Sequence, residues 1–336
     1  MTESLQNPSP VSTDVDLDID GLQHGHLSLA NSRNESALGS LQVPITVING
    51  GAGPTVTMVG GSHGDEYEGP VTLMKLAASL TASDISGRLI LLPCLNAPAI
   101  GSATRLSPFD QGNMNRSFPG SPDGTLTEKI ADFVTREIIA RSDYVLDIHS
   151  GGKTMDFTPL AAVHFLADAE QQERAEAAMI AFGAPDSLRM REMDDRGMLD
   201  TLVENQGKVF VTTELRGGGT ATRESLAVAM TGCRNLLVHT GLLDEPLELR
   251  STRMLEMPDE HCFVSARDSG MLELCVGLGQ PVYRGAVIAR IHDYKNSGRT
   301  AVEYTAGRDG ILMARHHPGL IENGDCLAVI AEEVPR

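Results

Sequence analysis

The chain lacks any apolar run of the roughly 20 residues needed to cross a bilayer, because charged or polar residues interrupt every apolar stretch. Its first residues, MTESLQNPSPVSTDVDLD, are polar and acidic and lack the basic start and apolar stretch of a secretory signal. We therefore expect residues 1–20 to form a flexible leader. We also expect the protein to be cytoplasmic, with no membrane partner.

Cysteine is scarce as well. The five cysteines are scattered, odd in number and include no C-x-x-C pair. This pattern argues against a disulfide framework and against a thiolate zinc site. A metal ion in this protein should therefore be bound by nitrogen and oxygen atoms.

Positive charge is the third shortage. The chain has 27 Lys and Arg residues against 45 Asp and Glu, giving a formal net charge of −18. Such a balance repels nucleic acid and anionic membranes, so we expect no nucleic-acid partner. The 336 residues, 41% of them hydrophobic, suffice for a large core and for two domains. The oligomeric state stays open, and a homodimer is one outcome.

Strand and helix patterns alternate from residue 21 to about residue 248. Apolar or β-branched runs predict strands at 21–29, 43–47, 55–59, 88–95, 144–148, 161–166 and 208–214. Apolar residues spaced three or four apart predict helices at 71–80, 126–140, 169–182 and 224–243. This alternation is typical of an α/β domain with a mostly parallel or mixed sheet flanked by helices. We expect residues 21–248 to form the catalytic domain.

The pattern changes from about residue 249. Short alternating runs follow one another, separated by Gly, Asn and Asp, and no helix is evident. We therefore expect a small all-β domain over 249–336. The segments GLGQPVYRGAVIARI and HHPGLIENGDCLAVI resemble the half-motifs of biotinyl-lipoyl-like domains, but the lysine that those domains modify is absent. We expect this domain to cap the active site rather than to carry a group.

Side chains able to bind or serve a metal ion follow three of the predicted strands. These residues are His63 and Glu66, His149, and Glu214. The carboxyl ends of parallel strands lie at one edge of a sheet, and ligands bind there. Two imidazoles and one carboxylate suit a catalytic zinc ion with an open fourth position, and Glu214 is then the free carboxylate for general-base work. Asp147 should either accept a hydrogen bond from a ligand imidazole or cap a nearby turn.

The loop from residue 96 to 119 supplies cations, Arg105 and Arg116. An arginine beside a metal ion can stabilise an oxyanion or hold a substrate carboxylate in a bidentate fork. The alternative is that both are ordinary surface arginines.

Five motifs then follow one another in a recognisable order: GGSHGDEYEG, NAPAIGSATR, NMNRSFPG, DIHSGG and TTELRGGG. In order and spacing they resemble the succinylglutamate desuccinylase/aspartoacylase family of the zinc carboxypeptidase superfamily, over nearly the whole chain after residue 21. The resemblance implies one Zn²⁺ per chain on His63, Glu66 and His149, with Glu214 as the catalytic acid/base. It also implies Arg105 at the oxyanion, and Asn115 and Arg116 on the substrate's α-carboxylate.

The activity implied by this resemblance is hydrolysis of an acyl group, in the first place acetyl, from a small N-acyl amino acid. Within the family, the long N-terminal strand region and the forms GGSHGDEYEGP and DIHSGG resemble deacetylases that act on an acetylated diamino acid in ectoine breakdown. An acidic group must then meet the side-chain ammonium, and Asp194 and Asp195 are candidates. Two features depart from the family pattern: Asp110 is displaced from the D-x-N-R spacing, and Arg216 closely follows Glu214.

Three alternatives remain. One is another N-acyl amino acid deacylase, of the succinylglutamate or N-acetylaspartate type. A second is a metallocarboxypeptidase that uses the same site on peptides. The third, a non-catalytic zinc-binding protein, is disfavoured because a structural site would not need Glu214 and two arginines around an open position.

Overall fold

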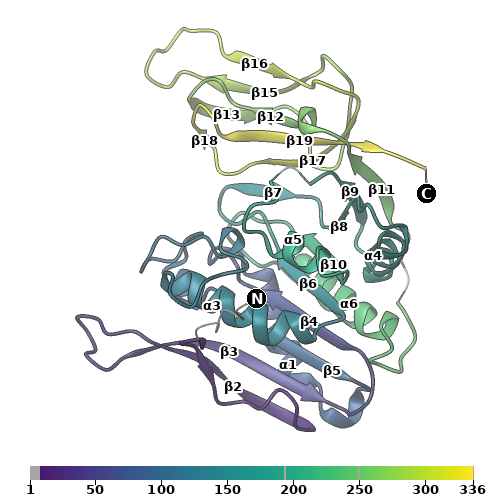
Figure 1. The fold of residues 1–336 in the computed structure, drawn as a ribbon. Coiled ribbons are helices and arrows are strands. Elements are labelled where there is room, and N and C mark those ends of the chain that lie inside the picture. The colour runs from purple at the N-terminus through teal and green to yellow at the C-terminus, as the bar shows by residue number, and fades with distance from the viewer. Residues whose placement is uncertain (1–7, 193, 249, 336) are drawn as a thin grey trace, which may run out of the picture.

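The structure, a computed structural model, describes residues 8–335 except 193 and 249. A large mixed sheet runs through the molecule in the strand order β1-β2-β3-β5-β4-β6-β10-β8-β9-β11-β19-β17-β14 (Figure 1). Helices cover both faces of its first part, and the C-terminal strands lie beyond one end of it (Figure 1). The prediction of a mixed α/β sheet followed by a small β module is confirmed.

The middle of the sheet is a parallel block. β4 (Thr55–Gly60) pairs in parallel with β5 (Arg88–Leu92) and with β6 (Tyr144–His149), and β6 pairs in parallel with β10 (Val209–Glu214). β8 (Leu160–His164) then runs antiparallel to β10. The carboxyl ends of β4, β6 and β10 therefore lie side by side at one edge.

The outer strands extend this block on both sides. β1 (Ser12–Thr13), β2 (Gly21–Ala30) and β3 (Ser40–Asn49) are antiparallel to their neighbours, and β3 pairs with β5. On the other side β8, β9 (Asp186–Met190) and β11 (Arg253–Met257) are parallel to one another. The sequence patterns did not predict β9 or β11.

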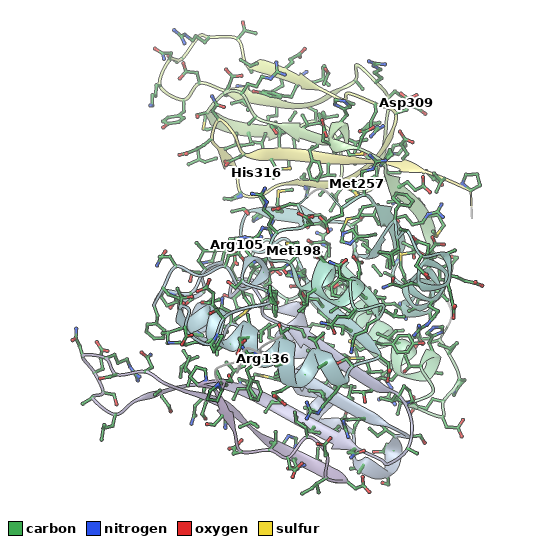
Figure 2. All side chains as sticks on the ribbon, in the orientation of Figure 1. Arg105, Arg136, Met198, Met257, Asp309 and His316 are labelled. Atoms are coloured by element: carbon green, nitrogen blue, oxygen red, sulfur yellow. The ribbon has the colours of Figure 1, made fainter. Side chains whose placement is uncertain are left out.

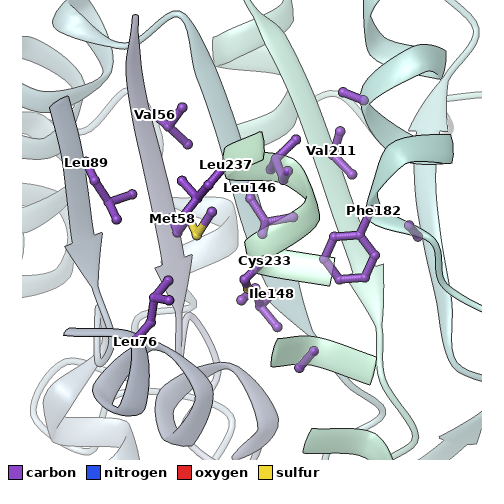
Figure 3. Packing of buried hydrophobic residues seen from close by; sticks show 14 of the residues in the cluster. Val56, Met58, Leu76, Leu89, Leu146, Ile148, Phe182, Val211, Cys233 and Leu237 are labelled. Atoms are coloured by element: carbon purple, nitrogen blue, oxygen red, sulfur yellow. The ribbon is translucent and has the colours of Figure 1, made fainter. Parts of the chain in front are cut away.

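Side chains of β5 show why the block is buried on both faces. Leu89 and Leu91 point into one core with α1 (Glu68–Ser79), α4 (Ala169–Phe182) and α6 (Arg223–His239), shown in Figure 3. Ile90 and Leu92 point into the opposite core. Successive strand residues face opposite sides, so a continuous apolar run fills both cores at once.

The second core lies under α3 (Leu126–Phe133) and α5 (Leu199–Glu204). Thr125 and Glu128 form the predicted capping box at the start of α3. The predicted helix at 126–140 is interrupted, because a π-helical turn replaces the α-helix over Val134–Ile138. Val134 and Ile138 stay buried within that turn, so the apolar spacing continues although the helix type changes.

The expectation of a flexible leader does not describe residues 11–17. Ser12 and Thr13 pair with β2, and Val11, Val15 and Leu17 are buried in the second core. Residues 1–7, which belong to the same expectation, lie outside the described residues.

Beyond β11, the C-terminal module contains eight short strands among the described residues. They are β12 (Phe263–Ser265), β13 (Gly270–Leu274), β14 (Pro281–Val282), β15 (Val287–His292), β16 (Val302–Thr305), β17 (Gly310–His316), β18 (Leu320–Ile321) and β19 (Cys326–Glu333). Two of them join the main sheet: β19 pairs with β11, and β17 pairs with β7 (Met155–Phe157). The two modules therefore share one hydrogen-bonded sheet.

Among the residues described, no helix combines the length and apolarity that spanning a membrane would require.

Candidate active site

The site is built at the carboxyl ends of β4, β6 and β10. His63 and Glu66 lie in the turn between β4 and α1, where Gly61 takes a φ of +69°, a conformation that favours glycine. His149 is the last residue of β6, and Glu214 is the last residue of β10, directly opposite it in the register. The sheet thus brings together four side chains from three distant parts of the chain.

Three of these residues converge on one point, and we call His63, Glu66 and His149 the His63 cluster. Their ligand-type atoms all lie within 4.8 Å of one another, and all three residues are buried. Nδ1 of His63 lies 2.7 Å from one Glu66 oxygen, and Nδ1 of His149 lies 3.0 Å from the other. The Glu66 carboxylate therefore sits between two imidazoles.

Acceptors outside the cluster fix the orientation of both rings. Nε2 of His63 lies 3.1 Å from Oδ1 of Asn113, which also accepts the backbone N–H of Asn115. Nε2 of His149 lies 2.9 Å from Oδ2 of the buried Asp147. Each Nε2 is thus oriented by an acceptor outside the cluster, and each Nδ1 faces Glu66.

This arrangement fits a bound cation. Two imidazole nitrogens that face one carboxylate can either donate hydrogen bonds to it or, with the ring protons on Nε2, act as ligands of a cation together with it. Nitrogen and oxygen donors of this kind are the ligands of catalytic zinc sites. The donor set of the His63 cluster thus matches a single divalent ion.

The pKa shifts within the cluster also favour an ionised Glu66 between the two imidazoles. Burial alone would raise the pKa of Glu66, but His63 and His149 hold that pKa well below its usual range. Burial opposes charge on His149, yet Asp147 and Glu66 raise the pKa of its imidazole. The carboxylate therefore stays ionised at any pH at which the protein works.

Glu214 stands beside the cluster as a free carboxyl group. Its Oε2 is buried and has no hydrogen-bond partner among the described residues. Burial, together with the negative charge of Glu66, raises the pKa of Glu214 to about 8. A carboxyl group with a pKa near neutrality is suited to take up and release a proton.

Arg105 reaches the cluster from the segment that follows the short helix α2 (Ala97–Ser102). Its Nη1 lies 3.5 Å from Oε1 of Glu66, and about half of the side chain, 53%, is exposed. Arg105 lies on the side of the main sheet that faces the C-terminal strands (Figure 2). The guanidinium is thus placed to meet a negative charge that forms next to the cluster.

Asn115 and Arg116 lie in a tight turn that contacts a second segment, residues 194–199. Asn115 Nδ2 lies 3.5 Å from Nε2 of His149, while its Oδ1 accepts the backbone N–H of Leu199. Arg116 pairs through Nε with Asp194 at 3.1 Å. The seven residues to which the family resemblance assigns a role therefore lie in the His63 cluster or in segments next to it.

Three other candidates have different surroundings. Asp110 accepts hydrogen bonds from Thr127 and so caps α3, away from the cluster. Arg216 pairs with Asp156 at 3.3 Å. Asp195 is exposed and lines a surface cleft with Glu192 and Glu204.

Sequence reasoning missed Asn113 and Glu68. The only signal for Asn113 is its place in the stretched D-x-N-R segment. Glu68 begins α1 and is fully buried. Burial raises its pKa to about 7, although the side chains of Ser150 and Ser225 act to lower it. Nothing in the local pattern distinguishes Glu68 from an exposed helix-start acid.

Fold and site together define a hydrolase whose reactive groups stand at the carboxyl edge of a mixed α/β sheet. Residues 52–240 match the model of the succinylglutamate desuccinylase/aspartoacylase catalytic domain. The N-alpha-acetyl-L-2,4-diaminobutyric acid deacetylase of Halomonas elongata is 52% identical over 98% of this chain and 97% of that protein. The chain belongs to the succinylglutamate desuccinylase/aspartoacylase family and is an enzyme that hydrolyses amide bonds.

Solved structures agree with this. A product-bound structure of the ectoine utilization protein EutE (DoeB) from Ruegeria pomeroyi covers 97% of this chain and 100% of its own, with a TM-score of 0.96 and 50% identity. A succinylglutamate desuccinylase from Silicibacter sp. TM1040 covers 98% and 100%, with a TM-score of 0.95 and 48% identity. The predicted resemblance, including that to the deacetylase branch, is confirmed.

Proposed function

We propose that this protein is a zinc-dependent amidohydrolase that converts N-alpha-acetyl-L-2,4-diaminobutyrate to 2,4-diaminobutyrate and acetate in ectoine breakdown, in the cytoplasm. The observation that carries the reaction type is the convergence of the His63 cluster beside the free carboxyl group of Glu214. The names of the Halomonas relative and of the ectoine utilization protein support the substrate.

His63, Glu66 and His149 would hold one zinc ion per chain. When bound, zinc supplies a Lewis acid that polarises a carbonyl group and lowers the pKa of water. Asn113 and Asp147 would accept hydrogen bonds from the outer ring nitrogens and so leave both Nδ1 atoms for a ligand role.

Glu214 moves the proton. It accepts a proton from the attacking water, and the water oxygen forms the new bond to the acetyl carbon. As the C–N bond breaks, Glu214 delivers that proton to the departing α-nitrogen. Arg105 stabilises the negative charge that develops on the carbonyl oxygen.

Asn115 and Arg116 bind the substrate's α-carboxylate. An arginine can hold a carboxylate with two parallel hydrogen bonds, which fixes the amide next to the cluster. Such positioning is worth several kcal/mol, up to about 10 kcal/mol, in well-oriented reactions.

The C-terminal module, residues 249–336, caps the catalytic domain of residues 21–248. Asp156 next to β10 pairs with Arg216 and, at 3.1 Å, with Arg315 of β17. The backbone N–H of His317 donates to the carbonyl of Thr154. A cap at this place favours small substrates over peptides, and so disfavours a metallocarboxypeptidase.

A substrate panel tests the proposal. The zinc-loaded enzyme is assayed with Nα-acetyl and Nγ-acetyl diaminobutyrate, with N-succinyl and N-formyl amino acids, and with a peptide as control. We expect Nα-acetyl diaminobutyrate to give the highest kcat/KM. Preference for succinylglutamate or N-acetylaspartate would favour the other family activities, and release of acetate from no substrate would reject the assignment.

A further inference from the structure

We propose that Asp194 selects the substrate by binding its side-chain ammonium, an inference that rests on the function proposed above. The substrate carries two opposite charges, the α-carboxylate and the terminal ammonium. Four bonds of about 1.5 Å separate the carboxyl carbon from that nitrogen, so the two charges lie at most about 5 Å apart. A site that recognises this molecule needs a cation and an anion at a similarly short separation.

Arg116 and Asp194 provide such a pair. Nε of Arg116 lies 3.1 Å from Oδ2 of Asp194. Nη1 of Arg116 donates to the carbonyl of Asn115 and contacts Sδ of Met198, whereas Nη2 has no partner among the described residues. The free Nη2 can receive the α-carboxylate while Asp194 stays at Nε.

The Asp194 carboxylate keeps capacity for a second cation. Its other oxygen, Oδ1, accepts only the backbone N–H of Arg196, at 3.4 Å, among the described residues. Half of the side chain, 50%, is exposed. An ammonium group brings three donors, so it can use Oδ1 without displacing Arg116.

Asp194 is held in place by its surroundings. Its backbone N–H donates to Oε1 of Glu192 at 2.8 Å, and Glu192 lies 3.4 Å from the buried His164. At the other end of the same loop, the carbonyl of Gly197 accepts the N–H of Phe118. A Cβ on Gly197 would overlap the Arg116 carbonyl, so the loop and the Arg116 turn are in direct contact.

Asp194 also opposes the wrong substrates. An N-acyl amino acid with a carboxylate side chain, such as N-acetylaspartate, would bring a second anion next to Asp194. Like charges in a binding site disfavour the unwanted ligand. The same residue therefore attracts the cationic side chain and repels the anionic one.

The test compares N-acetyl-L-2,4-diaminobutyrate with N-acetyl-L-norvaline, in which a methyl group replaces the ammonium. We expect Asp194→Asn to lower the ratio of the two kcat/KM values by about 10- to 100-fold, through the diaminobutyrate substrate. Asp194→Glu should retain a preference for the cationic substrate. Asp195→Asn, the matched control, should leave the ratio unchanged.

Each other outcome has a distinct meaning. If Asp194→Asn lowers kcat/KM for both substrates equally, or changes neither, Asp194 does not bind the ammonium and the inference is overturned. A wild-type enzyme that cleaves both substrates equally overturns it as well. If the wild-type enzyme cleaves neither substrate, the proposed function itself fails.

Discussion

Two groups of histidine and carboxylate side chains in the catalytic domain invite comparison, because in each the ligand-type atoms lie within 4.8 Å of one another. One is the His63 cluster. The other consists of His164, Glu192 and Asp200; together with Glu204, which contacts the same imidazole, we call it the His164 cluster. In that cluster Nδ1 of His164 lies 3.1 Å from both oxygens of Glu204, and Nε2 lies 3.4 Å from Glu192. A single imidazole thus bridges carboxylates on both sides.

The donor sets separate the two groups. In the His63 cluster two imidazoles face one carboxylate. His164, like His149, has carboxylates at both nitrogens, but no second imidazole belongs to its group among the described residues. Burial opposes a positive charge on His164, but Glu204, Asp200 and Glu192 raise the pKa of its imidazole. Two imidazoles on one carboxylate therefore distinguish the His63 cluster from a single imidazole held among carboxylates.

The largest expected effect comes from Glu214. Glu214→Gln removes the proton acceptor and leaves the His63 cluster intact, so kcat should fall by about 10³-fold or more while zinc stays bound. Acetate release and zinc content by atomic emission are the measurements. Glu204→Gln in the His164 cluster should work at close to the wild-type rate. Normal turnover by Glu214→Gln would remove the proposed mechanism.

Metal content distinguishes the clusters directly. His149→Ala removes one of three ligands and should lose most of its zinc, whereas His164→Ala should keep about one ion per chain. Both proteins are dialysed against a chelator, reloaded and analysed for zinc. Equal loss of zinc in both variants would contradict the assignment.

A smaller effect is expected from changing Asp147, the hydrogen-bond acceptor at Nε2 of His149. Asp147→Asn weakens the hydrogen bond that orients this ring, and zinc affinity should fall by about 10- to 100-fold. Competition with a chromogenic chelator measures the affinity. The matched change Asp200→Asn should leave it unaltered, and an unchanged affinity in Asp147→Asn would show that the acceptor is dispensable.

The smallest effect is a pH dependence of stability from the His164 cluster. The folded state holds a proton on His164 more tightly than the unfolded state, so this stabilisation is present below pH 6.5 and is lost as the pH rises through the folded pKa. Burial raises the pKa of Asp200 from 3.8 to about 6. The folded state therefore binds this proton more tightly, and stability also falls as the pH rises between these two pKa values. Tm should drop by a few degrees between pH 6 and pH 9, and less in His164→Gln. Parallel Tm curves for the two proteins would contradict this.

The strand ends that carry the active-site residues could be predicted from the sequence, because the patterns that mark them are local. An apolar run followed by a polar turn predicts where β4, β6 and β10 end, and parallel pairing then brings those ends together. Asp147 could be placed on the face of His149 from the two-residue repeat of a strand.

Other features have no local signal. Asp194 forms an ion pair with Arg116, and the backbone N–H of Leu199 donates to Asn115, across long sequence separations. No periodicity or motif in the sequence predicts such pairs. β9 and α5 were missed because each is short. Polar residues of β9, among them Asp186 and Arg189, interrupt the apolar pattern of a strand that is only five residues long.

The strand pairs β7–β17 and β11–β19 have a consequence for how ligands enter. The C-terminal strands cannot move away from the main sheet as a rigid body without breaking those backbone hydrogen bonds. We therefore expect ligand entry to depend on movements of side chains beside the His63 cluster, such as the half-exposed Arg105. Cross-linking the two modules should consequently leave turnover intact.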